Sequence, residues 1–346
     1  MAVNSQDLVE WLDGCQIRDV ATPDGVSSYL RDTQDTLSTE LENGDIVGLG
    51  DVFYTTLLSE LTGTDLHPSF QDAVSSLVGN LATDEGGYQE LTSEMVATVN
   101  GWDGQEVRPT ALGTAYCVFL NEIFGRGYDN SPSNIADWLI DLQEDGLFIN
   151  PSWSNTNLRH RYPTEYIQEA FLALTTLEIL NQRSAVPKIP YEETVQFIRN
   201  RPLWGSDFLS AEYYSVRVLE QAGEDLDDKA RMQEFLDKHQ SEVDVGYQEY
   251  LLEEKSDKQS GSSSRTGRDS VTPMVYASVQ ALLMKKRYGL ESKSQLRREN
   301  TELLNHAKSE SGGYGFKVTI REYEPTYGPE TTPRETYYAV LGKNSI

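Results

Sequence analysis

Apolar residues recur along the chain at helical spacing and not in the alternating pattern of a β-strand. They gather in six segments rich in Tyr, Ala and Leu, which begin at Asp51, Thr114, Glu169, Glu212, Met274 and Glu335. Another helical pattern precedes each of these segments. The sequence therefore predicts helices in six pairs and no large sheet.

The first helix of each pair carries a repeated motif. An aromatic or aliphatic residue is followed by an aliphatic one, three further residues, Gln and then Gly beside an aromatic. The copy at Trp138-Leu139, with Gln143 and Gly146, is the cleanest. The other copies begin at Trp11, Leu77, Phe197, Phe235 and Leu303. A helical hairpin of this kind cannot bury both of its faces alone, so neighbouring pairs must stack on one another.

This motif resembles the repeat of squalene cyclases, terpene cyclases and prenyltransferase β-subunits, and the resemblance extends over nearly the whole chain. It implies an all-α (α/α)6 toroid, in which six helical hairpins close into an inner and an outer helical ring. One domain spanning residues 1–346 is expected, closest in size to a monodomain class II terpene cyclase. An open helical solenoid is the alternative that the repeat alone allows.

The extra length of the chain falls between the glycine motif and the second helix of a pair. The long connections span about residues 89–108, 149–161, 250–269 and 317–333. Connections of one type lie on one rim of a repeat protein, where ligands tend to bind. Within one of them, the composition of residues 256–270 predicts a flexible rim loop, and a lid over a cavity is the alternative.

Basic residues at this rim suggest a site for an anionic head group. The second helices should begin at the rim, so that their positive dipole ends face it. The candidate anion-binding residues are Arg108, Arg161 and Arg334. Alternatively, each arginine neutralises a neighbouring Asp or Glu.

Aromatic residues concentrate in the first turns of the predicted inner helices. Aromatic faces attract cations by ~0.5–2 kcal/mol per contact, so a ring of them would both shape an apolar substrate and stabilise carbocations. Packing between helices is the ordinary alternative. The candidate substrate contacts are Tyr54, Tyr116, Phe119, Tyr166, Tyr214, Tyr276, Tyr337 and Tyr338.

The family resemblance also implies an acid. Terpene cyclases that start by protonation use an Asp-x-Asp-Asp motif whose middle aspartate stays protonated. Residues 225–228 match this motif, but they precede a predicted outer helix, so we interpret Asp228 as a helix N-cap. Carboxylates at the starts of inner helices are the remaining candidates for an acid or a base, with complementing the helix dipole as the alternative role. They are Glu335, Glu169, Glu212 and Asp51.

No metal or cofactor is expected. A protein prenyltransferase would need zinc ligands in an Asp-x-Cys pair and a later histidine, together with a helical partner subunit. The only cysteines are Cys15 and Cys117, neither in such a pair, and the four histidines are scattered.

The net charge of −26 disfavours binding to nucleic acid and indicates an acidic, solvated surface. No apolar run is long enough to span a membrane, and the N-terminus lacks the pattern of a signal peptide. A cytoplasmic location is therefore expected, and nothing in the sequence indicates an oligomeric state.

Together these features predict an isoprenoid cyclase of the terpenoid or meroterpenoid class, acting as an isomerase or lyase. Protonation would start the reaction in an aromatic-lined central cavity, although the acid motif departs from the family pattern. The alternative is a toroid without the acid, which binds a hydrophobic ligand or cyclises it by confinement. A protein that binds partners through its rim loops is a further possibility.

Overall fold

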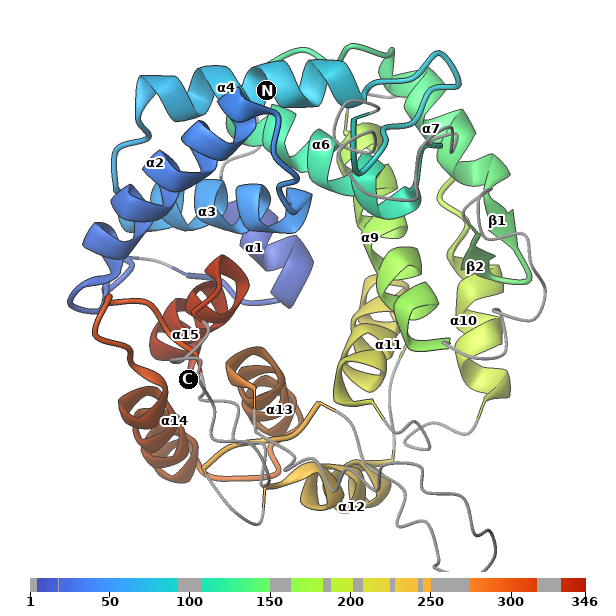
Figure 1. Ribbon diagram of the computed structural model, residues 1–346. Coiled ribbons are helices and arrows are strands. Elements are labelled where there is room, and N and C mark those ends of the chain that lie inside the picture. Colours follow the sequence, from blue (N-terminus) through green and yellow to red (C-terminus); the bar gives the residue numbers. More distant parts are fainter. Residues whose placement is uncertain are drawn as a thin grey trace, which may run out of the picture.

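The chain folds as a closed ring of paired helices (Figure 1). The computed structural model describes residues 5–17, 19–92, 108–149, 163–182, 188–201, 208–224, 228–241, 245–249, 274–315 and 331–346. The inner ring consists of α3 (Leu49–Thr62), α6 (Ala111–Ile123), α9 (Pro163–Asn181), α11 (Leu209–Gln221), α13 (Val275–Tyr288) and α15 (Pro333–Ser345). The outer ring consists of α2 (Val26–Asn43), α4 (Pro68–Leu81), α7 (Pro132–Asp141), α10 (Tyr191–Asn200), α12 (Lys229–His239) and α14 (Lys293–Ala307).

Contacts between successive inner helices close the ring. Each inner helix packs on the next, from α3 through to α15, and α15 then packs on α3. The strands among the described residues are the short antiparallel pair β1 (Gln143–Glu144) and β2 (Leu147–Phe148). The predicted all-α toroid of six hairpins is therefore confirmed, and the open solenoid is excluded.

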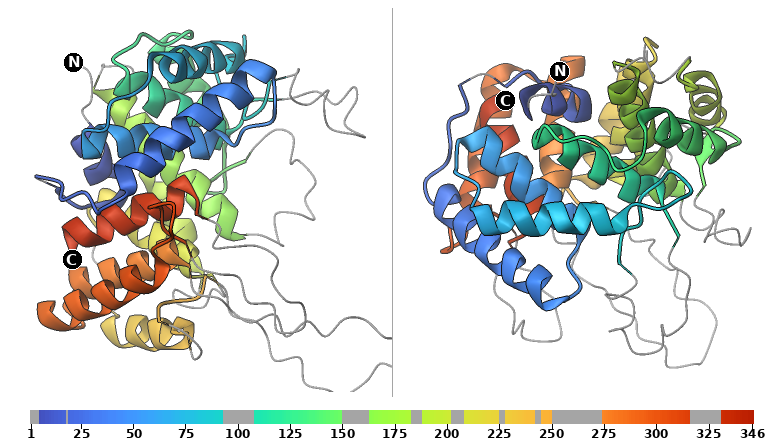
Figure 2. Two further views of the ribbon diagram at one scale, coloured as in Figure 1. Left: turned by 60° about the vertical axis from the view of Figure 1, so that its left-hand side comes forward. Right: turned by 90° about the horizontal axis from the view of Figure 1, so that it is seen from above.

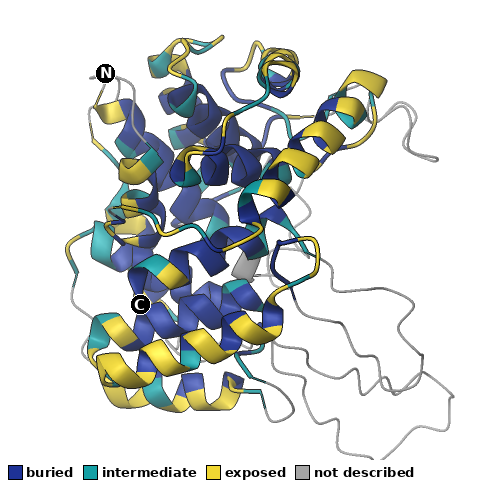
Figure 3. Ribbon diagram, turned by 90° about the vertical axis from the view of Figure 1, so that its left-hand side faces the viewer, coloured by how far each residue is buried: buried dark blue, intermediate teal, exposed yellow. Residues whose placement is uncertain are grey.

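The inner helices are buried on nearly all sides, whereas the outer helices are buried on one face only (Figure 3). In α6 every residue from Gly113 to Glu122 is buried, because this helix is covered on all sides. The outer helix α10 buries only Thr194 and Ile198, which lie one turn apart on a single face. Among the described residues, no helix is long and apolar enough to cross a membrane.

The glycine motif forms a turn that packs against the next outer helix. A Cβ atom at Gly87 would lie 2.8 Å from the indole ring of Trp138 on α7. A Cβ atom at Gly146 would lie 2.4 Å from the carbonyl oxygen of Glu193 on α10. The last turn closes the ring in the same way, because Gly312 packs against Gly25 at the start of α2. Glycine is thus required where one hairpin meets the next.

In three of the turns the aromatic residue is hydrogen-bonded to an inner helix. The backbone N–H of Tyr88 donates to Oγ1 of Thr114 at 2.9 Å, and that of Tyr247 donates to Oγ of Ser278 at 2.8 Å. The backbone N–H of Tyr314 donates to a threonine of α15 in the same way. This contact fixes the turn against the helix that follows it.

Replacement of Gly312 by alanine tests the ring closure. The φ angle of Gly312 is 90°, and the new Cβ would lie 2.3 Å from the carbonyl oxygen of Gly25. We expect the free energy of unfolding in urea to fall by about 3 kcal/mol or more. Gly289→Ala is the matched control, because Gly289 also has a positive φ but no atom lies within 4 Å of its Cβ position. It should cost about 1 kcal/mol, and equal losses for both variants would contradict the closure contact.

The prediction that the first copy of the repeat begins at Trp11 is wrong. Trp11 and Leu12 lie on an additional helix, α1 (Ser5–Asp13), which is not part of the outer ring. The first outer position belongs to α2, where Tyr29 packs under the glycine turn as Trp138 does on α7. Tyr29-Leu30 with Gln34 has the same spacing, so the motif occurs twice before α3.

Helix α1 lies at one end of the ring and is hydrogen-bonded to α15 through Asp13 and Tyr337 (Figure 2). It packs on α3 and α9 and is hydrogen-bonded to α11, α13 and α15. The C-termini of the inner helices surround it, and we call this the closed end. The opposite end, where the inner helices begin, is called the mouth. The long connections and the loop at 256–270 lie almost entirely outside the described residues.

Candidate functional site

Tyrosine and phenylalanine rings from the inner helices meet in the centre of the ring. The ring of Tyr54 on α3 lies with its centroid 6.3 Å from that of Tyr116 on α6 and 5.2 Å from that of Tyr337 on α15. Further contacts join Phe53 to Phe119, Phe171 to Tyr214, Tyr213 to Tyr214, Tyr337 to Tyr338, and Tyr338 to Tyr276. We call this set the aromatic layer. Most of the aromatic residues predicted to line the centre are thus in mutual contact.

The hydroxyl groups of this layer stay protonated. Burial raises the pKa of Tyr116 to about 12 and raises those of Tyr54 and Tyr338 well above the usual range. Nε2 of Gln280 donates to the Tyr338 hydroxyl at 3.1 Å. The layer is therefore neutral and electron-rich, which suits contact with an apolar chain or with a cation.

Arg334 stands at the mouth, in the first turn of α15. Its guanidinium carbon lies 4.1 Å from the centroid of the Tyr276 ring, and Nη2 donates to the Tyr214 hydroxyl at 3.5 Å. Among the described residues, no carboxylate lies within ion-pair distance of Arg334, and its buried Nε has no hydrogen-bond partner. A guanidinium that stacks on an aromatic ring and forms no ion pair among the described residues can bind an anion through its N–H groups.

Glu335 follows Arg334 and is also partly exposed. Its Oε2 accepts a hydrogen bond of 2.8 Å from the backbone N–H of Tyr276, at the start of α13. Burial raises the pKa of the Glu335 carboxyl to about 7, although the hydrogen bond from Tyr276 and the charge of Arg334 oppose the rise. Burial therefore favours the neutral, proton-carrying form of Glu335 far more than in a solvent-exposed glutamate.

A second carboxyl at the mouth was not found from the sequence. Glu249 is only 7% exposed, and both of its carboxylate oxygens accept the backbone N–H of Ser210 on α11, at 3.3 Å each. The Ser210 hydroxyl also donates to it. Burial raises the pKa of Glu249 to about 7, against the hydrogen bonds from Ser210 and the charge of Arg334. Glu249 lies two residues after Tyr247 in a turn, so no helix-start signal pointed to it.

Asp13 at the closed end is the other carboxyl that sequence reasoning missed. It is 2% exposed and accepts hydrogen bonds from the hydroxyls of Tyr213 at 2.8 Å and Tyr337 at 2.5 Å. Burial raises its pKa, while the two tyrosines and the charges of Arg217 and Arg287 act in the opposite direction. Asp13 thus contacts the aromatic layer from the side opposite to Arg334.

Two arginines hold α1 in place. Arg217 on α11 donates to the carbonyl oxygens of Trp11 at 2.8 Å and Leu12 at 3.3 Å. Arg287 on α13 donates to the carbonyl oxygen of Asp13 at 3.0 Å. Both guanidinium groups also pair with Glu220, at 2.6 Å and 2.9 Å. They therefore satisfy the free carbonyl groups at the C-terminus of α1, where positive charge is favourable.

The other carboxylates predicted from the sequence lie on three different inner helices. Glu212 is fully buried and pairs with Arg201 at 3.0 Å, in a contact that joins α11 to the end of α10. Asp51 is partly exposed at the start of α3, where burial and the charge of Glu40 raise its pKa. Glu169 is buried within α9. Glu212 thus faces the end of α10, and the catalytic roles suggested for Glu212, Asp51 and Glu169 stay predictions.

The predicted roles of Arg108, Arg161 and Tyr166 stay predictions. Arg108 is exposed, and Arg161 lies outside the described residues. Tyr166 is buried in α9. The interpretation of Asp228 as a helix N-cap is confirmed, because its side chain accepts the backbone N–H of Arg231 at the start of α12.

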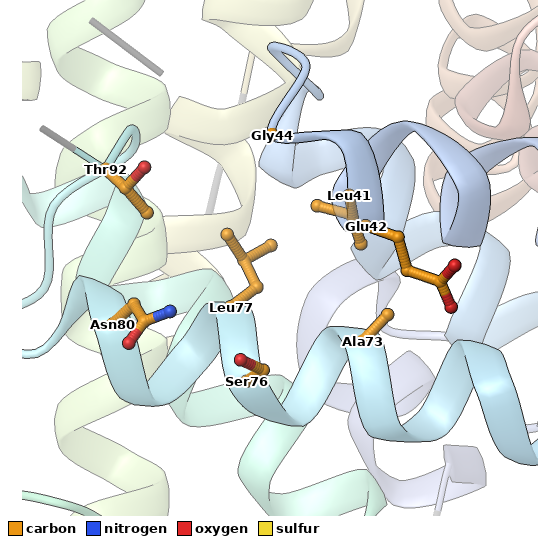
Figure 4. A pocket seen from close by; sticks show the side chains of 8 residues that line it. All are labelled: Leu41, Glu42, Gly44, Ala73, Ser76, Leu77, Asn80 and Thr92. Carbon is orange, nitrogen blue, oxygen red and sulfur yellow. The ribbon is translucent and has the colours of Figure 1, made fainter. Parts of the chain in front are cut away.

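A surface pocket elsewhere on the molecule contains none of these residues. It lies on the outside of the ring between α2 and α4, and Leu41 and Leu77 contribute to its lining together with Thr92 (Figure 4). Its lining contains no cationic side chain and no aromatic ring. The centre of the ring is therefore the candidate site.

Comparison with known proteins supports the fold but not a particular activity. No protein-family model and no curated protein matches the sequence. Among solved structures, the chain is similar to Candida albicans protein geranylgeranyltransferase-I complexed with GGPP, with a TM-score of 0.58 and 12% identity. The match covers 91% of this chain and 89% of that one. At this identity the likeness shows the fold alone, the α/α toroid.

Proposed function

We propose that this protein cyclises an isoprenoid that carries an anionic head group, and that protonation by Glu335 starts the reaction. The observation that carries the proposal is the arrangement at the mouth. A partly exposed carboxyl with a pKa of about 7 lies next to the guanidinium of Arg334, which stacks on Tyr276, beside a layer of tyrosine rings. An acid, an anion site and a cation-stabilising surface are the three elements that such a reaction needs.

Arg334 would bind the head group. Its planar fork of N–H groups matches a carboxylate or a phosphate, and the Tyr276 ring holds it in place. The similar solved structure is a complex with GGPP, which supports an isoprenoid diphosphate as one candidate ligand. The apolar chain of the ligand would then extend over Tyr54, Tyr116 and Tyr214.

Glu335 would deliver the proton. Its O–H bond breaks while the π electrons of an alkene in the chain form a new C–H bond, which leaves a carbocation on the adjacent carbon. The resulting carboxylate of Glu335 is stabilised by Arg334 and by the N–H of Tyr276. Neighbouring alkenes then attack the cation and close rings, until loss of a proton or addition of water ends the sequence. The faces of the tyrosine rings would stabilise each carbocation formed during the reaction.

Glu335 suits this role better than Glu249 does. Both carboxyls have a pKa of about 7, but both oxygens of Glu249 are engaged with Ser210, and Glu249 is buried. Glu335 is partly exposed and is engaged through the backbone of Tyr276. It can therefore meet a substrate that Arg334 has bound.

Binding of a head-group series tests the proposal. The probes are GGPP, the corresponding carboxylic acid and the corresponding alcohol, which share one chain. We expect Arg334→Met to weaken binding of the two anions by about 10- to 100-fold and to leave the alcohol nearly unchanged. Arg126→Met is the control, because Arg126 is exposed at the C-terminal end of α6.

Equal effects of Arg334→Met on all three probes would contradict an anion site at the mouth. Tight binding of the anions without formation of a cyclic product, over several chain lengths, would support the alternative of a non-protonating binding protein. Products are detected by gas chromatography with mass spectrometry after removal of the head group.

A further inference from the structure

The motif Gly-Tyr-Gln-Glu occurs twice in the chain, once in the turn that leads to α6 and once in the turn that leads to α13. The backbone hydrogen bonds of the two copies match. The N–H of Thr110 donates to the carbonyl oxygen of Tyr88, and the N–H of Met274 donates to the carbonyl oxygen of Tyr247. Thr110 and Met274 are therefore equivalent, and each is the N-cap residue of its inner helix.

The glutamate side chain of the motif has different partners in the two copies. Glu90 accepts a hydrogen bond of 2.6 Å from the hydroxyl of Thr110, within its own hairpin. Methionine at position 274 has no hydroxyl, and Glu249 instead accepts the backbone N–H and the hydroxyl of Ser210 on the neighbouring helix α11. Glu249 is also buried, whereas Glu90 is partly exposed. The second copy thus directs its carboxyl to another hairpin.

Ser210 holds Glu249 beside Arg334. Ser210 and Tyr214 are four residues apart on α11, so they lie one turn apart on the same face of the helix. Ser210 bonds to Glu249, and the Tyr214 hydroxyl accepts Nη2 of Arg334 at 3.5 Å. Burial raises the pKa of Glu249 to about 7, and the charge of Arg334 is among the effects that oppose this rise. Glu249 and Arg334 therefore interact electrostatically at the mouth.

The other groups that interact with Arg334 are mostly phenols that keep their protons. They lie on five inner helices, and burial raises the pKa of each one; they are Tyr54, Tyr116, Tyr214, Tyr276 and Tyr338. The charge of Arg334 also acts on the carboxyl of Glu335, whose pKa burial raises to about 7 as well. Glu249 and Glu335 are thus the groups at Arg334, among the described residues, that change charge near neutral pH.

We propose that Glu249 is a positioning residue for anion binding: it takes up a proton from solvent when an anionic head group binds to Arg334, and so leaves the guanidinium charge to the ligand. Glu249 acts through Arg334 and need not touch the head group. The inference rests on the anion site of the proposed function and does not depend on cyclisation.

The balance of charge at the mouth makes proton uptake the expected result of anion binding. When both carboxyls are ionised, one guanidinium faces two carboxylates, so an added anion is repelled. A proton on Glu249 removes part of this repulsion. The bound anion in turn raises the pKa of Glu249 further, because a nearby negative charge disfavours the carboxylate. The affinity for an anion is therefore highest well below pH 7 and falls as the pH rises through 7.

Proton uptake is measured by titration calorimetry with farnesyl sulfonate, which stays ionised at every pH used, and with farnesol as the neutral probe. Binding heats in two buffers that differ in ionisation enthalpy give the number of protons taken up. At about pH 7.5 we expect about 0.5–1 proton per sulfonate for the wild-type protein and about zero per farnesol. An increase from about pH 6 to about pH 8 should weaken sulfonate binding by about tenfold.

Glu249→Gln is the main variant. It should lower proton uptake by about half or more, and it should reduce the effect of pH on sulfonate binding to about threefold, because Glu335 still titrates. Glu90→Gln is the matched control, since it makes the same change at the equivalent glutamate of the other copy. Its proton uptake should equal that of the wild-type protein.

Ser210→Ala tests the same role without removing the carboxyl. The hydrogen bonds from Ser210 favour the carboxylate form of Glu249, so loss of the hydroxyl raises the pKa of Glu249 further. The pH at which sulfonate binding weakens should therefore rise in this variant. If Glu249→Gln does not fold, Ser210→Ala decides the matter, and an unchanged or lower pH would overturn the inference.

The outcomes separate this inference from the proposed function. Sulfonate binding without proton uptake would overturn the inference and leave the anion site intact. Proton uptake that is unchanged in Glu249→Gln would also overturn it. Equal affinity for the sulfonate and farnesol would overturn both the inference and the anion site. Proton uptake as expected, without a cyclic product from any isoprenoid, would support the inference and refute only the proposed reaction.

Discussion

Glu335→Gln is expected to reduce the rate of cyclisation by about 10²- to 10⁴-fold once a substrate is in hand. The amide keeps the shape of the side chain and can still accept the N–H of Tyr276, but it cannot donate a proton to an alkene. Substrate affinity should change little, because Arg334 remains in place. The measurement is single-turnover product formation at saturating substrate, with circular dichroism as the check on folding.

The pH dependence of the reaction has a definite sign. Burial raises the pKa of Glu335 from 4.5 to about 7, so the proton-donating form prevails below pH 7 and is lost above it. The rate should therefore be constant at lower pH and fall about tenfold per pH unit above 7. Glu249→Gln is the matched control, since Glu249 has a similar pKa but is engaged with Ser210. A large loss in Glu249→Gln with a normal rate in Glu335→Gln would assign the acid to Glu249 and contradict the proposed role of Glu335.

Arg217→Met is expected to lower the free energy of unfolding by about 3–5 kcal/mol. Its side chain is 6% exposed, and its removal leaves Glu220 and the carbonyl groups of Trp11 and Leu12 without their donor. Methionine fills a similar volume, so the loss reflects the missing charge and hydrogen bonds. Unfolding in urea, followed by circular dichroism, gives the measurement.

The control for this prediction is Arg199→Met. Arg199 pairs with Glu224 across the surface, and the side chains are 54% and 39% exposed. An exposed pair contributes about 0–1 kcal/mol, so this variant should remain close to the wild-type protein. Similar losses in the two variants would mean that the network at the closed end is not a main support of α1.

The ring of hairpins could be predicted from the sequence because the fold repeats. Each inner helix is buried on all sides, as α6 shows, and each glycine turn must approach the next outer helix closely. Because every hairpin packs in this way, apolar inner helices and glycine turns recur in every copy of the repeat. The one error in the register arose at Trp11, because the spacing found at Tyr29-Leu30 with Gln34 also occurs on α1.

The candidate site was predictable only in part. The tyrosines near the starts of the inner helices, and Arg334 and Glu335, follow from the position of the helix N-termini at the mouth. Asp13 and Glu249 do not, because each lies outside an inner helix and reaches the centre through contacts between segments far apart in sequence. Glu212 also lies in the first turn of an inner helix, but one position later than Glu335 does, and its side chain pairs with Arg201. One position along a helix turns the side chain toward another neighbour, so a carboxylate in the first turn is not by itself a sign of the site.

Deuterium incorporation tests the central claim, that a protein acid starts cyclisation in the ring, most directly. The wild-type protein is incubated with the isoprenoid substrate in D₂O, and the cyclic product is analysed by mass spectrometry after exchange of its O–D groups. Because the acid equilibrates with solvent, the product should carry one deuterium, at the carbon that was protonated. A cyclic product without deuterium would contradict protonation as the first step.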